Sequence, residues 1–138
     1  MRAAICTMLL VGALTAGTIA QPQSSQFPVI YYPDAAVASG IQGGILDIER
    51  DLIRFRPNSG QLAWVIDLGN VESVVVEPFA GPFRTVSSIV ITSLENGRRV
   101  RRRIAAVDDL SLNERAMLAG MIRLRVEQFK AARVALRQ

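Results

Sequence analysis

Apolar and polar residues alternate in short runs between Gly43 and Val107, and turn-forming residues separate the runs. Alternation with a period of two predicts β-strands, because successive side chains of a strand point to opposite faces of a sheet. Four strands are expected in the first part of this region, at 45–48, 52–55, 62–68 and 71–77. The first two flank a short polar turn and therefore predict an antiparallel hairpin.

A second hairpin is predicted at Asn96-Gly97, the residue pair that a two-residue type I′ turn favours. Its strands cover 88–94 and 99–107, and the length of the turn fixes which residues face each other. One face is apolar and is expected to be core, with Ile89, Ile91, Val100 and Ile104. The other face carries a ladder of three guanidinium groups, Arg99, Arg101 and Arg103.

Arg102 falls on the apolar face of this hairpin, opposite Ile91. A charged group on the core side needs an acidic partner or a position at the rim of the sheet. Trp64 and the Met117–Met121 pair lie at alternating and helical spacings, so they are expected to be core residues and not the lining of a ligand groove.

The spacing of apolar residues changes near the C-terminus to steps of three and four. Ser111 followed by Glu114 forms a capping box, which predicts a helix starting near Leu112. The apolar side of that helix is expected to hold Met117, Leu118, Met121, Ile122, Leu124, Phe129 and Ala132. We expect an amphipathic helix over 112–137.

The first twenty residues have the pattern of an export signal. Arg2 precedes an unbroken run of apolar and small residues from Ala3 to Ala20. Such a segment engages the membrane during export, and small residues before Gln21 predict cleavage after Ala20. The expected location is periplasmic or secreted, and an uncleaved membrane anchor remains an alternative.

Residues 21–42 are expected to form a tether between the signal peptide, 1–20, and a domain covering 43–138. The segment contains glutamine, serine and three prolines, which favour an extended and unpaired backbone. Its apolar stretch from Phe27 to Tyr32 could lie along the domain or add an edge strand.

The composition restricts the possible chemistry. The chain has no histidine, and its one cysteine, Cys6, lies in the predicted signal. Catalysis by Ser-His-Asp or Cys-His sets and zinc hydrolysis are therefore excluded, and neither a cofactor nor a metal is expected. Carboxylate pairs, Lys130 or a carboxylate site for a hard metal remain as possible means of catalysis. The alternative function is a hydrolase that uses two carboxylates, for instance on cell-wall sugars, drawn from Asp47, Glu49, Asp51, Asp67, Glu72 and Glu77.

Three of these acidic residues, Asp47, Glu49 and Asp51, alternate along one strand and turn. They lack the glycine and the distal glutamate of a calcium loop, so they are expected to be surface carboxylates paired with arginines. The formal charge of the whole chain is +4, too small to indicate a nucleic-acid partner.

The order of elements resembles the PH-like superfold, including its bacterial and GRAM-type members. The resemblance rests on the segments GGILDIERDLIRFRP, WVIDLGNVESVVVEP and SIVITSLENGRRVRRRI and on the terminal helix. It implies a mainly β α+β fold, an antiparallel roll or barrel of about six to seven strands followed by one long helix. A further strand could come from 29–38.

This superfold hosts binding domains of several kinds and therefore implies no single function. The sequence predicts an exported, non-enzymatic binding or scaffolding domain. Arg99, Arg101 and Arg103 could bind phosphates or carboxylates of an anionic envelope component or of an acidic protein. The alternative is a charged face that only protects the sheet from aggregation.

Overall fold

The computed structural model describes residues 25–33, 40–81, 84–107 and 112–138, with only the backbone of 112–115. The predicted export signal and the side chains of the predicted capping box lie outside the described residues. No helix in the described ranges combines the length and the apolar character that a membrane span requires.

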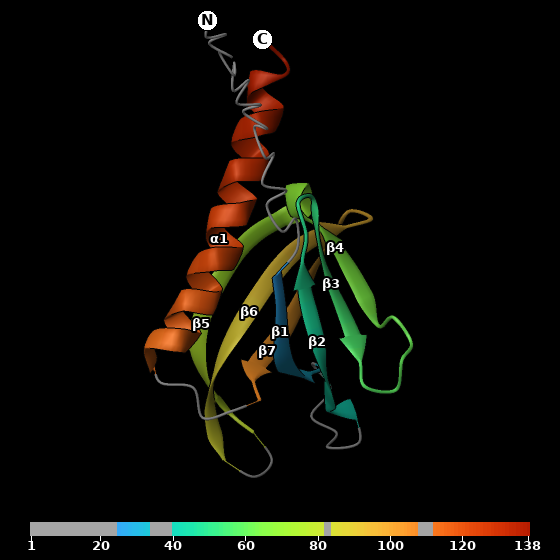
Figure 1. Cartoon of the computed structure of the whole chain (residues 1–138), viewed down its shortest axis with the longest axis vertical. Helices are drawn as coiled ribbons and strands as arrows, with labels where there is room; N and C mark the ends of the chain where they lie inside the picture. The colour runs from blue at the N-terminus through green and yellow to red at the C-terminus, as the bar shows by residue number, and fades with distance from the viewer. Residues whose placement is uncertain (1–24, 34–39, 82–83, 108–111) are drawn as a thin grey trace, which may run out of the picture.

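Seven strands and one long helix make up the described part of the chain (Figure 1). The strands are β1 (Ser25–Tyr32), β2 (Gln42–Ile48), β3 (Leu52–Pro57), β4 (Trp64–Asp67), β5 (Val71–Ala80), β6 (Thr85–Glu95) and β7 (Arg98–Ala106). A 3-10 turn, η2 (Leu68–Asn70), joins β4 to β5, and α1 (Leu112–Ala135) follows β7. The strands form one antiparallel sheet in the order β4-β3-β2-β1-β7-β6-β5. The expected mainly β architecture with a C-terminal helix is confirmed.

Strand β1 corrects the tether predicted over 21–42. Its residues are hydrogen-bonded to β2 on one side and to β7 on the other, so β1 is central and not an edge strand. Val29 is fully buried and holds the strand in the core. Pro28 precedes the stretch that pairs with β7, and a residue that cannot donate a hydrogen bond is tolerated there. The domain therefore begins well before residue 43.

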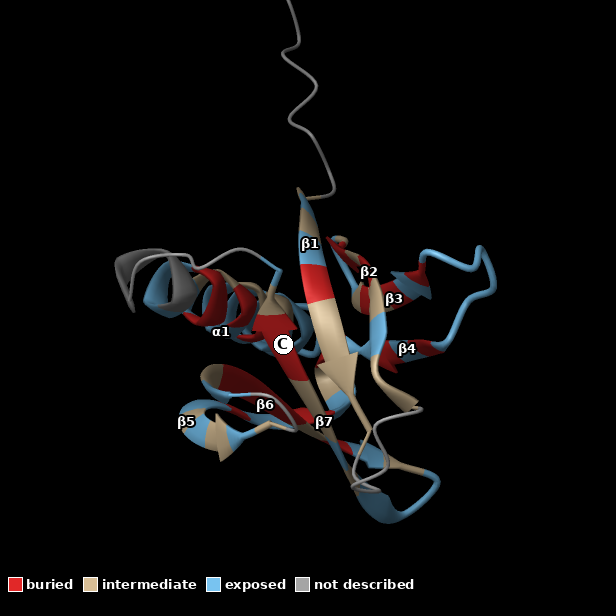
Figure 2. Ribbon diagram, turned by 90° about the horizontal axis from the view of Figure 1, so that it is seen from below, coloured by how far each residue is buried: buried red, intermediate tan, exposed pale blue. Residues whose placement is uncertain are grey.

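The core lies inside the curved sheet, where the buried residues of the strands face one another (Figure 2). The ring of Trp64 stacks on Phe55 with centroids 5.4 Å apart, and Tyr31 packs against both rings. Trp64 is 8 % exposed, so its predicted place in the core is confirmed. Burying large aromatic side chains in this way is a major source of folding free energy.

Helix α1 runs along β5 and extends beyond the strands towards the C-terminus (Figure 1). Its buried residues recur at helical spacing and are Leu118, Ala119, Ile122 and Val126, with Phe129 partly buried. Ala132, which was predicted on the apolar side of the helix, is exposed. The predicted core positions of Met117 and Leu124 are also wrong, because both side chains are more than half exposed. These two residues are seven apart and lie on a different side of the helix from the buried stripe.

Charged residues of α1 also complete the open edge of the sheet. Arg123 Nε donates a hydrogen bond to the carbonyl of Val74 (2.8 Å), and Lys130 Nζ donates to that of Val71 (2.6 Å). Both carbonyls belong to β5, which has a neighbouring strand on one side only. The helix therefore supplies hydrogen-bond donors that a further strand would otherwise provide.

Candidate anion-binding face

The β6–β7 hairpin has the predicted register. Glu95 pairs with Arg98, Ile91 with Arg102 and Ile89 with Ile104. The turn residues Asn96 and Gly97 both have positive φ, 49° and 75°, as a type I′ turn requires. On the inner face Ile89, Ile91 and Ile104 are buried, as expected, whereas Val100 is only half-buried.

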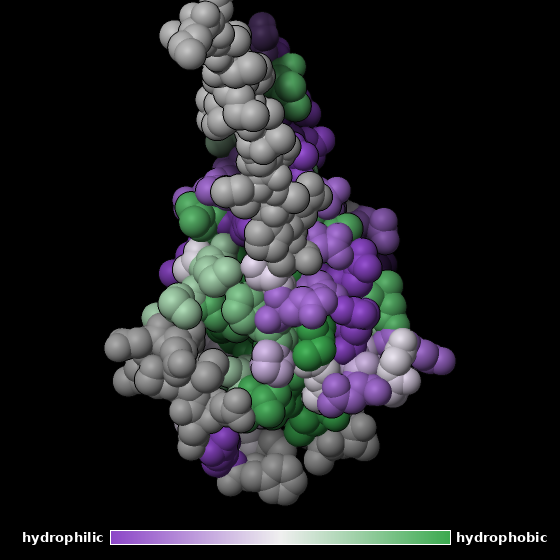
Figure 3. Space-filling view, in the orientation of Figure 1, coloured by the Kyte–Doolittle hydropathy of each residue, from purple (hydrophilic) through white to green (hydrophobic). Residues whose placement is uncertain are grey.

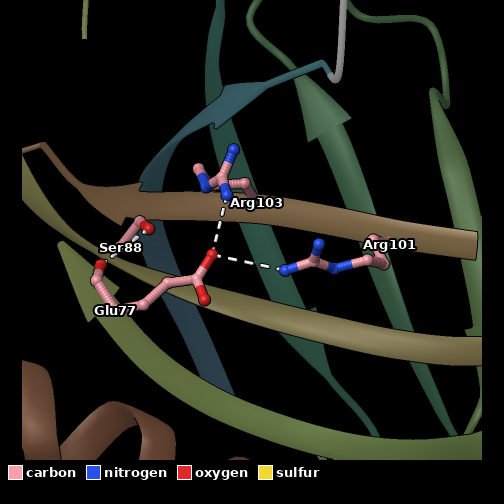
Figure 4. Close-up of polar contacts among 4 residues, drawn as sticks. All are labelled: Glu77, Ser88, Arg101 and Arg103. Atoms are coloured by element: carbon pink, nitrogen blue, oxygen red, sulfur yellow. Dashed lines mark hydrogen bonds and ion pairs between the residues drawn. The ribbon is translucent and has the colours of Figure 1, made fainter. Parts of the chain in front are cut away.

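The three arginines of the predicted ladder lie on the outer face of the hairpin, but they are not free. Each reaches across β6 to a glutamate of β5. Arg99 Nε lies 2.7 Å from Glu72 Oε2, while Glu77 Oε1 accepts from Arg101 Nη2 (3.3 Å) and Arg103 Nη2 (2.7 Å) (Figure 4). The hydrogen bond that Arg99 donates to Glu72 raises the pKa of Arg99 above its ordinary value.

Exposure decreases steadily along the ladder. The side chain of Arg99 is 75 % exposed, that of Arg101 53 % and that of Arg103 18 %. The guanidinium of Arg103 lies over the ring of Phe79 at 4.2 Å, and that ring contacts Tyr32 edge to face. Arg103 is therefore part of a packed layer on the outer face, whereas Arg99 and Arg101 face solvent.

Val90 lies on the outer face of the hairpin but is buried, although this face was predicted to be a charged surface. It lies opposite Arg103 and Val75 in register and is 1 % exposed. Glu77 is further fixed by its own backbone, because Ser88 Oγ donates to the Glu77 carbonyl at 3.0 Å (Figure 4). The end of the ladder near Arg103 is consequently structural.

Arg102 has the acidic partner that its inward position demands. Its guanidinium forms a two-pronged ion pair with Glu95, one contact being Nη2 to Oε2 at 3.0 Å, and lies 5.2 Å from the ring centre of Trp64. Ser93 Oγ donates to Glu95 Oε1 at 2.6 Å. The hydrogen bond from Arg102 lowers the pKa of Glu95, against the opposing effect of burial.

The carboxylates considered for catalysis or metal binding are mostly engaged by other groups. Asp47 pairs with Arg56 (2.8 Å) and Glu49 with Arg54 (3.1 Å), as expected, although Asp47 is buried and not at the surface. Asp67 Oδ1 accepts a hydrogen bond from the amide of Gly69 and so caps η2. The described residues contain no cluster of three potential metal ligands.

Neither a protein-family model nor a curated protein sequence matches the chain. Among solved structures, it is similar to the complex of the PDZ-RhoGEF DH/PH domains with GTP-gamma-S activated RhoA, with a TM-score of 0.53 and 12 % identity. The match covers 76 % of this chain but 29 % of that chain. At this identity the likeness concerns the fold alone, and together with the seven antiparallel strands and the C-terminal helix it shows a PH-like fold.

Proposed function

We propose that the chain is an exported, non-enzymatic binding or scaffolding domain that engages an anionic component of the cell envelope through strand β7. The observation that carries this proposal is the pair of exposed guanidinium groups of Arg99 and Arg101 on one face. Alternate residues of a strand lie about 7 Å apart, a spacing suited to successive phosphates or carboxylates.

The charge of the face supports an anionic partner. Three arginines meet two glutamates there, which leaves one positive charge in excess. Glu77 is shared between Arg101 and Arg103, so it cannot neutralise both. Glu72 and Glu77 hold the guanidinium groups in place, and an incoming anion can bind the donor nitrogens that these carboxylates leave unused.

Two features of the chain support binding and not catalysis. Histidine is absent from the sequence, and Cys6 is the one cysteine. Asp47, Glu49, Glu72 and Glu77 form ion pairs with arginines, so these carboxylates are engaged in contacts within the fold.

Export rests on the sequence of residues 1–20, and with it the periplasmic or secreted location. Mass spectrometry of the protein isolated from cells gives the test. A mature N-terminus at Gln21 would support cleavage, and an intact Met1 would favour the membrane-anchored alternative.

The binding proposal is tested with lipopolysaccharide, vesicles of anionic phospholipid and peptidoglycan as separate probes. We expect the protein to bind at least one, and the double variant Arg99→Gln with Arg101→Gln to bind it about tenfold more weakly or worse. Arg137→Gln, at the exposed end of the chain, removes the same kind of charge elsewhere and serves as the control. Binding to none of the probes, or binding that the double variant does not change, would contradict the proposal.

A further inference from the structure

A second positively charged site lies between the β2–β3 turn and the C-terminal half of α1. A cavity of about 190 Å³ is lined there by Arg50 from the turn and by Arg125, Gln128, Phe129 and Ala132 from the helix. None of these residues belongs to the arginine face of β7. The volume is several times the ~30 Å³ that one water molecule occupies in the liquid, so the cavity has room for an oxyanion.

The two arginines of this cavity have no ion-pair partner among the described residues. Arg50 is exposed and Arg125 is half-buried, and among the described residues neither has a buried side-chain nitrogen without a partner, so both guanidinium groups can meet a ligand from solvent. Glu49, beside Arg50 in the turn, pairs with Arg54, and Asp67 caps η2. The other acidic residues close to these arginines in sequence are Asp51 and Glu127, and neither lines the cavity. The arginines of the strands mostly pair with glutamate or aspartate, so this site is different.

Neighbouring side chains add to the positive potential. Arg133 lies over the ring of Phe129, with 5.7 Å between its guanidinium carbon and the ring centre. Its Nη1 atom lies 2.8 Å from the place where a β-carbon on Gly69 would be, so the glycine leaves room for this side chain. The carboxamide of Gln128 can donate two further hydrogen bonds.

We infer that this cavity binds the phosphate group of a phosphate monoester. At neutral pH such a group carries close to two negative charges, which match the two unpaired guanidinium groups, whereas a carboxylate would leave one uncompensated. Guanidinium groups bind phosphate oxygens through paired hydrogen bonds. The ring of Phe129 and the methyl group of Ala132 form an apolar wall against which the organic part of the ligand packs.

Titration calorimetry on the purified protein tests this site, with glycerol 3-phosphate and acetate as soluble probes. We expect glycerol 3-phosphate to bind, acetate to bind more weakly, and Arg50→Gln and Arg125→Gln each to weaken glycerol 3-phosphate binding about tenfold. Arg137→Gln is the matched control, since it removes an exposed guanidinium that does not line the cavity and should leave this binding unchanged, whereas Arg99→Gln tests the face of β7. Arg50→Lys, which keeps the charge but loses the fork, should lie between the wild type and Arg50→Gln.

Two further measurements vary the pH and the molecule that carries the phosphate. Lowering the pH from 7 to about 5 protonates a phosphate monoester, whose second pKa is near 6, and should weaken binding while both arginines stay charged. Co-sedimentation with phosphatidylcholine vesicles, with and without phosphatidic acid, distinguishes a lipid headgroup from a soluble ligand. Failure of both glycerol 3-phosphate and phosphatidic acid to bind would overturn the inference, as would binding that neither Arg50→Gln nor Arg125→Gln weakens. Loss of binding in Arg99→Gln alone would assign the phosphate to the face of β7 instead.

Discussion

Two neighbouring arginines of β7 have opposite surroundings. The side chain of Arg102 is 12 % exposed and lies against Glu95 and Trp64, whereas that of Arg101 is 53 % exposed and touches one shared glutamate. Both are arginines of one unbroken run, Arg101 to Arg103, so the residue type does not explain the difference. The alternation of a strand places one on the core side and the other on the outer face.

Like charges that are adjacent in the sequence can therefore have different structural roles. The inward arginine stabilises the fold, because it neutralises a glutamate near the core. Arg99 and Arg101 on the outer face keep their guanidinium groups exposed to solvent. The two roles separate experimentally, since a change on the inner face should affect stability and a change on the outer face should affect binding.

The largest difference in stability between substitutions on the two faces is expected for Ile91 and Thr92. Ile91 is fully buried opposite Arg102, so Ile91→Ala should lower the free energy of unfolding by about 2–5 kcal/mol. Thr92 is half-buried on the outer face, and Thr92→Ala should cost less than about 1 kcal/mol. Urea unfolding followed by circular dichroism measures both, and similar losses would show that the two faces are not distinct.

The arginines themselves should show the next largest effect. Arg102→Ala leaves Glu95 partly buried without its partner and should cost about 2 kcal/mol, less than for a fully buried pair because water still reaches this one. Arg101→Ala removes a solvent-exposed ion pair and should cost about 0–1 kcal/mol. Urea unfolding of the two variants side by side is the measurement, and a larger loss for Arg101→Ala would refute the division of roles.

A smaller effect is expected from pH, through Glu95. Its pKa is lowered in the folded protein from an ordinary value of 4.5, so the unfolded chain takes up the proton first as the pH falls. The stability that Glu95 contributes is complete above this value and is lost as the pH drops through the folded-state pKa. In thermal unfolding, the advantage of the wild type over Glu95→Gln should therefore shrink below pH 4.5. An advantage that grows with acidity would contradict this assignment.

The smallest change in stability is expected for Arg99→Gln. The side chain is 75 % exposed, and surface ion pairs such as Arg99–Glu72 contribute little to folding. The melting temperature should be indistinguishable from that of the wild type, although binding of the anionic partner is weakened. Differential scanning calorimetry checks this, and a clear loss of stability would assign Arg99 a structural role.

The features fixed by local chemistry were predictable from the sequence. Asn96-Gly97 determines a turn type, the turn determines the register, and the register assigns Arg102 inward and Arg101 outward. The need of Arg102 for an acidic partner followed from burial alone, and Glu95 fulfils it.

The features that depend on distant strands were not predictable. The pairing of Arg101 and Arg103 with Glu77 depends on the β5–β6 register, which shifts at a bulge between Val71 and Ser73. The central position of β1 was not predicted because Pro28 lies in this strand and Pro22 and Pro33 lie close to its ends. Local sequence preference cannot show that β2 and β7 are available as its neighbours.

Which apolar side chains stay exposed at the surface was also not predictable from the sequence. Hydrophobic residues remain exposed among hydrophilic ones on the face that Figure 3 shows. Large apolar side chains that are exposed in the described part of the chain include Leu62, Val65, Leu124, Val134 and Leu136. On α1, apolar residues occur on more sides than the sheet can cover, and the contacts with β5, β6 and η2 select the buried stripe. Periodicity alone therefore overestimated the apolar side of the helix.

The most direct test of the arginine face compares Arg101→Gln with Glu77→Gln in binding to whichever of lipopolysaccharide, anionic phospholipid vesicles and peptidoglycan the wild type binds. The measurement is made at one low ionic strength, where charge effects are least screened. If the outer face of β7 binds an anion, Arg101→Gln should weaken binding. Glu77→Gln should strengthen it, because the face loses a negative charge while the amide oxygen can still accept hydrogen bonds from Arg101 and Arg103. Opposite shifts in affinity are the predicted result, and shifts in the same direction, or no shift in either variant, would contradict the account.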